Sequence, residues 1–138
     1  MISVRKQEVV KLEDVLHLYQ AVGCTNYTHQ PQMLEKALSH SLAIYLAHDG
    51  DSVVGLVRLV GDGFSSIFVQ DLLVLPSYQR QGIGSNLMKE ALGDFKDAYQ
   101  VQLVTEQTEK TLGFYRSLGF ETLSTYDCTG MIWVDRKR

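Results

Sequence analysis

The spacing of apolar residues along the chain switches between the period of a helix and that of a strand. Residues 2–4 predict a short first strand. From Leu12 to Val22 the apolar positions recur every three or four residues, which predicts a helix that ends at Gly23. A second helix is expected from Pro31, because the fixed φ of proline suits a first helical turn.

Three apolar runs then predict a meander of strands. The first two runs flank Asp49-Gly50, a strong hairpin signal. The third follows a glycine-rich turn and ends at Pro76, which has no amide hydrogen to give to a ladder. The predicted strands cover residues 42–47, 52–60 and 65–75.

The remaining chain continues the alternation of helices and strands. Apolar residues at helical spacing predict a helix between Ile83 and Phe95. A strand, a helix and a closing hairpin are expected next, over residues 101–105, 109–118, 120–125 and 131–134. The order is β-α-α-β-β-β-α-β-α-β-β, an α/β class. Its βαβ unit requires the strand at 101–105 to run parallel to the one at 65–75.

Composition narrows the class of protein. A chain of 138 residues, 45% hydrophobic and 21% charged, is most simply one globular domain over residues 1–138. Its net charge of −3 disfavours a general nucleic-acid binder, and it has no apolar run of the ~20 residues that span a membrane. Cys24 and Cys128 are expected to be reduced thiols, and the N-terminus lacks a signal-peptide pattern, so a cytoplasmic location is expected.

Residues 71–88 carry the most informative pattern, a buried strand followed by a glycine-containing loop and a helix start. Such a junction directs several amide hydrogens and the positive end of the helix dipole at one point, which favours a phosphate or pyrophosphate. No lysine follows Gly84, so the loop is not a Walker loop; Leu87 is too large for a dinucleotide fingerprint, and Ile83 stands where a nucleophile elbow needs serine. A helix entry that merely needs positive φ is the structural alternative.

What remains is the pattern Gln-x-x-Gly-x-Gly at residues 79–84, which resembles the acyl-CoA pyrophosphate loop of the GNAT N-acetyltransferases. A second pattern, Phe-Tyr-x-x-x-Gly-Phe at residues 114–120, resembles the segment that this family carries on the helix after its fifth strand. Core packing would explain the second pattern if it stood alone, but the two together are specific. The resemblance covers essentially the whole chain. It implies the family's fold, a mixed, mostly antiparallel central sheet with helices on both faces.

The resemblance also implies a reaction. Acetyl-CoA would be the cosubstrate, and its acetyl group would pass to a primary amine of a small molecule or peptide by direct attack in a ternary complex. Tyr115 would protonate the departing thiolate, since a phenol of pKa ~10 is protonated at neutral pH, and the Val74 amide would stabilise the tetrahedral intermediate. The expected cofactor contacts are Leu73, Val74, Leu75, Gln79, Arg80, Gln81, Gly82, Ile83, Gly84, Ser85 and Thr108, the last at a position where relatives often carry asparagine.

The attacking amine must first lose a proton. An alkylamine of pKa ~10.4 is unprotonated about once in 2,500 molecules at pH 7, so a base or a site that lowers its pKa is required. Asp71, Glu106 and His29 are the candidate bases, and Asp71 could equally be structural. Some relatives carry a carboxylate one residue earlier, where this chain has Gln70, which cannot act as a base.

The acceptor amine is expected to contact the segment between the first two helices. By resemblance, Tyr27 and His29 would line the acceptor wall, and Arg58 is a third candidate, although an outward, solvated position on its strand is slightly favoured. The resemblance also allows a homodimer. No metal, nucleic acid or membrane is expected as a partner. A non-catalytic acyl-CoA-binding sensor is the alternative function.

Overall fold

The computed structural model describes residues 1–134, and these contain one five-stranded sheet in the order β1-β2-β3-β4-β5. Neighbouring strands are antiparallel from β1 to β4. The last strand, β5, runs parallel to β4, which confirms the prediction from the βαβ unit. The strands are β1 (Ile2–Gln7), β2 (Ala43–Asp49), β3 (Ser52–Gly61), β4 (Ser66–Val74) and β5 (Gln100–Leu103).

The helices lie close to their predicted bounds. They are α1 (Leu12–Ala21), α2 (Thr25–Thr28), α3 (Pro31–Ser39), α4 (Ile83–Asp94) and α5 (Glu109–Ser117), with the 3-10 helices η1 (Pro76–Tyr78) and η2 (Leu123–Tyr126). The single turn α2 is an addition, because the segment that contains it was expected only to link two helices. The chain forms two compact units, Met1–Leu103 and a second that begins at Val104. A single domain over the whole chain stays a prediction.

The predicted closing hairpin is wrong. Residues 123–126 form η2, and residues 131–134 have no regular secondary structure. An apolar run becomes a strand only when another strand pairs with it. In the part of the chain that the structure describes, the sheet ends at β5, and neither predicted segment belongs to it.

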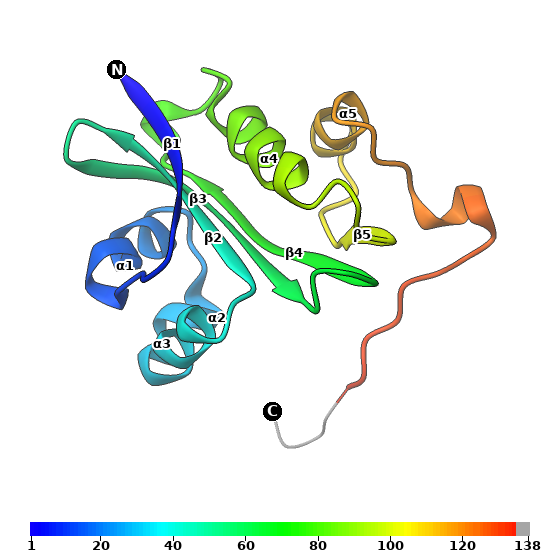
Figure 1. Ribbon diagram of the computed structural model, residues 1–138, viewed down its shortest axis with the longest axis horizontal. Helices are drawn as coiled ribbons and strands as arrows, with labels where there is room; N and C mark the ends of the chain where they lie inside the picture. Colours follow the sequence, from blue (N-terminus) through cyan, green and yellow to red (C-terminus); the bar gives the residue numbers. More distant parts are fainter. Residues whose placement is uncertain (135–138) are drawn as a thin grey trace. The chain divides into compact units, whose positions relative to one another are not determined.

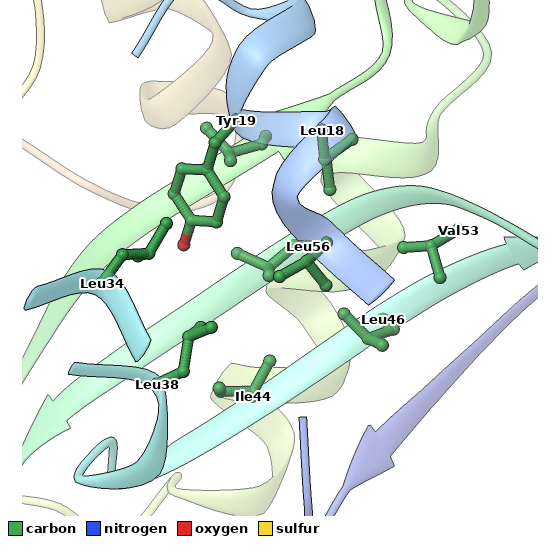
Figure 2. Packing of buried hydrophobic residues seen from close by; sticks show 10 residues of the cluster. Leu18, Tyr19, Leu34, Leu38, Ile44, Leu46, Val53 and Leu56 are labelled. Atoms are coloured by element: carbon green, nitrogen blue, oxygen red, sulfur yellow. The ribbon is translucent and has the colours of Figure 1, made fainter. Parts of the chain in front are cut away.

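Both faces of the sheet are covered within the first unit (Figure 1). The helices α1, α2 and α3 lie on one face and α4 lies on the other. Figure 2 shows how leucines of α1 and α3 pack onto β2 and β3. Burial of each such side chain stabilises the fold by about 1.5–3 kcal/mol. This cluster consists of Val15, Leu18, Tyr19, Leu34, Leu38, Ile44, Leu46, Val53, Leu56 and Leu73.

On the opposite face, α4 approaches β3 closely because Gly55 has no side chain. A Cβ added at Gly55 would lie 3.1 Å from Leu87 Cδ1 and 3.2 Å from Ile83 Cγ2. Ile83 is the first residue of α4, so this contact fixes where the helix begins relative to the sheet.

The strand β4 contains an irregularity that matters for the site. Arg58 pairs with Asp71 but its neighbour Leu59 pairs with Val69, so Gln70 is an extra residue in the ladder, a β-bulge. On its other side, β4 pairs with β5 only as far as Val69. The strand continues to Val74, and therefore its last five residues have no described strand on that side.

Candidate functional site

The loop that joins β4 to α4 holds a row of amides without protein acceptors. The backbone φ angles of Arg80 and Gly82 are 67° and 80°, and residues with such left-handed values turn successive amides toward a common concavity. The first hydrogen bond of α4 runs from the Asn86 amide to the Gly82 carbonyl, at 3.0 Å. Among the described residues, the amides at positions 80–85 meet no acceptor. Unpaired amides at the positive end of a twelve-residue helix form an anion site.

Two side-chain hydrogen bonds hold this loop in place. The Tyr78 hydroxyl donates to Asp49 Oδ2 at 2.7 Å, which joins the loop to the β2–β3 hairpin. This bond lowers the pKa of Asp49 and raises the pKa of Tyr78. The Gln79 side chain donates to the Val74 carbonyl at 3.1 Å, which joins the loop to the end of β4. The loop is therefore fixed from two sides although its residues 79–82 are exposed.

Val74 presents its peptide groups to the open side of β4. The Leu75 amide donates to the Val54 carbonyl at 2.9 Å. Hydrogen-bonded pairs alternate along an antiparallel ladder, so Val74, which lies opposite Gly55, directs its amide and carbonyl away from β3. The bond from Gln79 to the Val74 carbonyl agrees with this direction. Val74 thus offers an amide on the open side, whereas the Leu75 amide is already used.

A buried ion pair lies on the α1 face of the sheet. Arg58 Nε donates to Asp71 Oδ2 at 2.7 Å, and the two residues are 4% and 7% exposed. The Tyr19 hydroxyl donates to the same oxygen at 2.8 Å. Burial, and then the charge of Asp71, raises the pKa of Tyr19 far above its usual value, so this phenol stays protonated. Burial lowers the pKa of Arg58, but Asp71 outweighs this effect and the net change is upward.

The same guanidinium connects the ion pair to α2. Arg58 also donates to Ser41 Oγ at 3.2 Å and to the Tyr27 hydroxyl at 3.3 Å, and its Cζ lies 5.8 Å from the centre of the Tyr27 ring. The exposed Gln70 donates to the same hydroxyl at 3.1 Å. Burial, followed by the charge of Asp71, raises the pKa of Tyr27. These contacts connect the buried pair to the partly exposed phenol of Tyr27.

The expectation that Arg58 faces solvent is wrong. Its position on the strand places it on the same face as Leu56, under α1, and the carboxylate of Asp71 compensates its charge there. The structure therefore brings together three of the predicted site residues, Tyr27, Arg58 and Asp71. Tyr19 and Ser41 complete the network, and sequence reasoning missed both. Tyr19 belongs to the apolar stripe of residues 12–22, and the signal that could have found it is that a buried tyrosine hydroxyl needs a partner.

Other predicted residues lie elsewhere. His29 is exposed and lines an open hollow with Met33 and Lys36. In the second unit, Glu106 is exposed. Thr108 caps α5, since its hydroxyl accepts from the Thr111 amide at 3.2 Å. The roles predicted for these residues stay predictions.

Tyr115 is partly buried among aromatic rings of the second unit. Its ring centre lies 5.0 Å from that of Phe114 and 5.9 Å from that of Phe120, both in edge-to-face geometry. Burial raises the pKa of its phenol, and a hydrogen bond with Thr105 partly opposes that effect. A hydroxyl with a raised pKa is fully protonated at neutral pH.

Neither a candidate metal site nor a membrane-spanning helix is present in residues 1–134. No group of three or more His, Cys, Asp or Glu side chains in this range has the geometry to hold a metal ion. Within the same residues, every helix is too short or too polar to cross a membrane.

Comparison with known proteins places the chain in a family. The model of the acetyltransferase (GNAT) domain matches residues 40–122, more than half of the chain. A GNAT-family acetyltransferase from Streptococcus pneumoniae TIGR4 shares 79% sequence identity, covers 99% of both chains and superposes with a TM-score of 0.92.

Two more distant proteins are also similar to the chain. Serotonin N-acetyltransferase 2, chloroplastic, from Oryza sativa subsp. japonica is 32% identical over 95 residues, which make up 66% of this chain but only 48% of that protein. The aminoglycoside N-acetyltransferase AAC(6')-Iy, solved in complex with CoA, shares the fold with a TM-score of 0.67 at 20% identity, over 100% of this chain and 95% of that one. The chain belongs to the GNAT acetyltransferase family.

Proposed function

We propose that the protein transfers the acetyl group of acetyl-CoA to a primary amine of a small molecule or peptide, by direct attack within a ternary complex. The observation that carries the proposal is the row of unpaired amides at positions 80–85, beside a strand edge that ends open at Val74. The aminoglycoside N-acetyltransferase that shares the fold was solved in complex with CoA, which supports the same cosubstrate here.

The pyrophosphate of CoA would bind at the start of α4. Amides at a helix N-terminus favour anions through both their hydrogens and the helix dipole. Arg80 belongs to this loop and would add a charge-assisted hydrogen bond to a phosphate oxygen. The predicted contacts are completed by the backbone amides of Gln81, Gly82, Ile83, Gly84 and Ser85.

The thioester would lie along the open edge of β4. In this arrangement the pantetheine arm pairs with β4 as an added strand, and the Val74 amide donates to the thioester carbonyl oxygen. An amide fixed toward the oxygen that gains negative charge stabilises the tetrahedral intermediate. Because the Leu75 amide already binds Val54, Val74 is the donor that we assign to this step.

The acceptor amine would approach past Tyr27. Arg58 donates a hydrogen bond to this phenol, and Asp71 holds Arg58 in place. We therefore assign to Asp71 first of all the positioning of this network. Asp71 is also a candidate base, as are Glu106 and His29. The neutral amine nitrogen attacks the thioester carbon and its surplus proton passes to the base. The carbon–sulfur bond then breaks, and Tyr115 gives its proton to the departing thiolate. Burial raises the pKa of Tyr115, which keeps the phenol protonated at neutral pH until the thiolate forms.

Release of free thiol tests the proposal. Purified protein would be incubated with acetyl-CoA and a panel of amines that includes serotonin, an aminoglycoside, free amino acids and a peptide. Thiol release that needs both acetyl-CoA and one amine, with the N-acetylated product seen by mass spectrometry, is the expected result. Tight binding of CoA with no turnover of any amine would instead favour the non-catalytic sensor.

A further inference from the structure

The β2–β3 hairpin holds the loop that carries the unpaired amides. Asp49, the last residue of β2, accepts a hydrogen bond from the Tyr78 hydroxyl at 2.7 Å, although the two residues are 29 positions apart in the sequence. Tyr78 is the last residue of η1 and stands two residues before the amides at positions 80–85. Figure 1 shows the hairpin and the loop at the same end of the sheet. The start of the amide row is therefore fixed to the sheet through a side chain.

The other end of the amide row is fixed to the same hairpin. Ile83 is buried and packs against Gly55 of β3, where an added Cβ would lie 3.2 Å from Ile83 Cγ2. Residues 79–82, between the two fixed points, are exposed. One hairpin, distant in the sequence from the loop, thus holds the amide row at both ends.

The backbone between these two points needs such support. Arg80 has a φ of 67°, a left-handed value that side chains disfavour. A residue keeps such a conformation only where the surrounding structure imposes it. The left-handed values at Arg80 and Gly82 also turn successive amides toward one concavity. A contact that keeps Arg80 in this conformation therefore keeps the amides convergent.

A β-bulge lies in the hairpin where it meets the loop. In β3, Val54 is the extra residue opposite the step from Ala47 to His48. A bulge bends its strand and increases the twist. The Val54 carbonyl accepts a hydrogen bond from the Leu75 amide at 2.9 Å, and Asp49 follows His48 directly. The bulged part of the hairpin therefore contacts the chain both just before η1 and at the end of η1.

We infer that Asp49 is a positioning residue for the pyrophosphate of CoA and acts through Tyr78. The hydrogen bond between them keeps the backbone at Arg80 left-handed, and the amides at positions 80–85 then converge on the diphosphate. A carboxylate repels a diphosphate directly, so Asp49 favours the ligand only through the bond to Tyr78. The inference rests on the proposed function, because it concerns the binding of CoA at the start of α4.

Calorimetric titration with CoA tests the inference. Tyr78→Phe and Asp49→Ala should each raise the dissociation constant of CoA about tenfold, and the double variant should raise it no further, because both changes remove the same hydrogen bond. Asp49→Ala also removes a negative charge, so an electrostatic effect alone would tighten the binding of CoA instead. Asp49→Asn, which still offers an acceptor oxygen to Tyr78, should lose less affinity than Asp49→Ala.

The matched control is another tyrosine–aspartate hydrogen bond of the same strand. Tyr45, in β2, donates to Asp94 Oδ2 at 2.6 Å, and Asp94 is the last residue of α4, at the opposite end of the helix from the amide row. Tyr45→Phe should leave the dissociation constant of CoA within about twofold of the parent. Circular dichroism should show parent-like folding for all of these variants.

A ligand without the diphosphate separates positioning of the loop from a general loss of structure. The affinity for pantetheine, measured at millimolar concentration by displacement of CoA, should change less than about twofold in Tyr78→Phe. Equal losses for CoA and pantetheine, additive losses in the double variant, or a parent-like affinity of Tyr78→Phe for CoA would each overturn the inference. A parent that binds CoA but acetylates no amine would refute only the proposed transfer, whereas turnover by the parent with unchanged affinities in the variants would refute only the role of Asp49.

Discussion

The buried pair of Arg58 and Asp71 gives the sharpest prediction about stability. The substitution Asp71→Asn keeps the shape of the side chain and removes its charge. Arg58, which is 4% exposed, would then remain in the core as a cation with no anion beside it. Removing one partner of a buried ion pair costs about 3–5 kcal/mol, because the remaining charge is neither solvated nor compensated.

This loss is large compared with the total free energy of unfolding. Domains are stable by about 5–15 kcal/mol, and for a chain of this length each 1 kcal/mol lowers the melting temperature by about 3 °C. We therefore expect Asp71→Asn to melt about 10–15 °C below the parent. The double variant Arg58→Met with Asp71→Leu removes both charges and should recover most of the loss, since apolar pairs replace buried ion pairs at little cost.

Guanidinium unfolding of the parent, the single variants Arg58→Met and Asp71→Leu, and the double variant gives the coupling free energy directly. The control is Glu121→Gln, which breaks the exposed pair between Arg116 and Glu121, separated by 3.5 Å with both side chains about half exposed. That change should cost less than about 1 kcal/mol. A loss below about 1 kcal/mol for Asp71→Asn, or a double variant no more stable than Asp71→Asn, would refute the argument that the pair exists to neutralise a buried cation.

Three further outcomes are expected. Gly82→Trp should raise the dissociation constant of CoA at least 100-fold in calorimetry, because the indole would occupy the anion site and the left-handed φ of 80° at this position disfavours any Cβ. The control Gly93→Trp, at another glycine with open space around it, should bind CoA normally, and equal affinities of the two variants would contradict the site. Tyr115→Phe should lower kcat by about 100-fold or more with little change in KM, whereas Tyr126→Phe, at an exposed tyrosine, should leave kcat unchanged. A kcat of Tyr115→Phe equal to that of the parent would show that Tyr115 is structural. The hydrogen bond from Ser65 Oγ, with those from three backbone amides, lowers the pKa of Asp62 well below its usual range, so the stability that the Asp62 carboxylate contributes is present above pH ~4 and is lost as the pH falls. The difference in melting temperature between the parent and Asp62→Asn should therefore shrink on acidification, and a constant difference would contradict a role of the carboxylate charge.

The sequence predicted most of the first unit because its signals are local. The turn at Asp49-Gly50, the strand stop at Pro76 and the loop before Ile83 each depend on a few neighbouring residues, and all three were confirmed. The parallel placement of β5 followed from connectivity alone.

The errors involve partners that are distant in the sequence. The burial of Arg58 depends on Asp71, thirteen residues away, and on the register that sets the two side by side. The closing hairpin failed for a related reason, since residues 131–134 have the composition of a strand but a strand also requires a neighbour.

The bulge at Gln70 has a consequence for how this site tolerates change. Directly paired residues of a sheet share a face, so Val69 lies on the side of Leu59 whereas Asp71 lies on the side of Arg58. The inserted residue thus reverses the in-and-out alternation of the strand halfway along its length. Shortening β4 by one amino acid would turn the acid at 71 away from its arginine, an outcome that no replacement of the glutamine by another amino acid can produce. Chain length at this point, more than the chemistry of residue 70, is what sequences with this arrangement must keep.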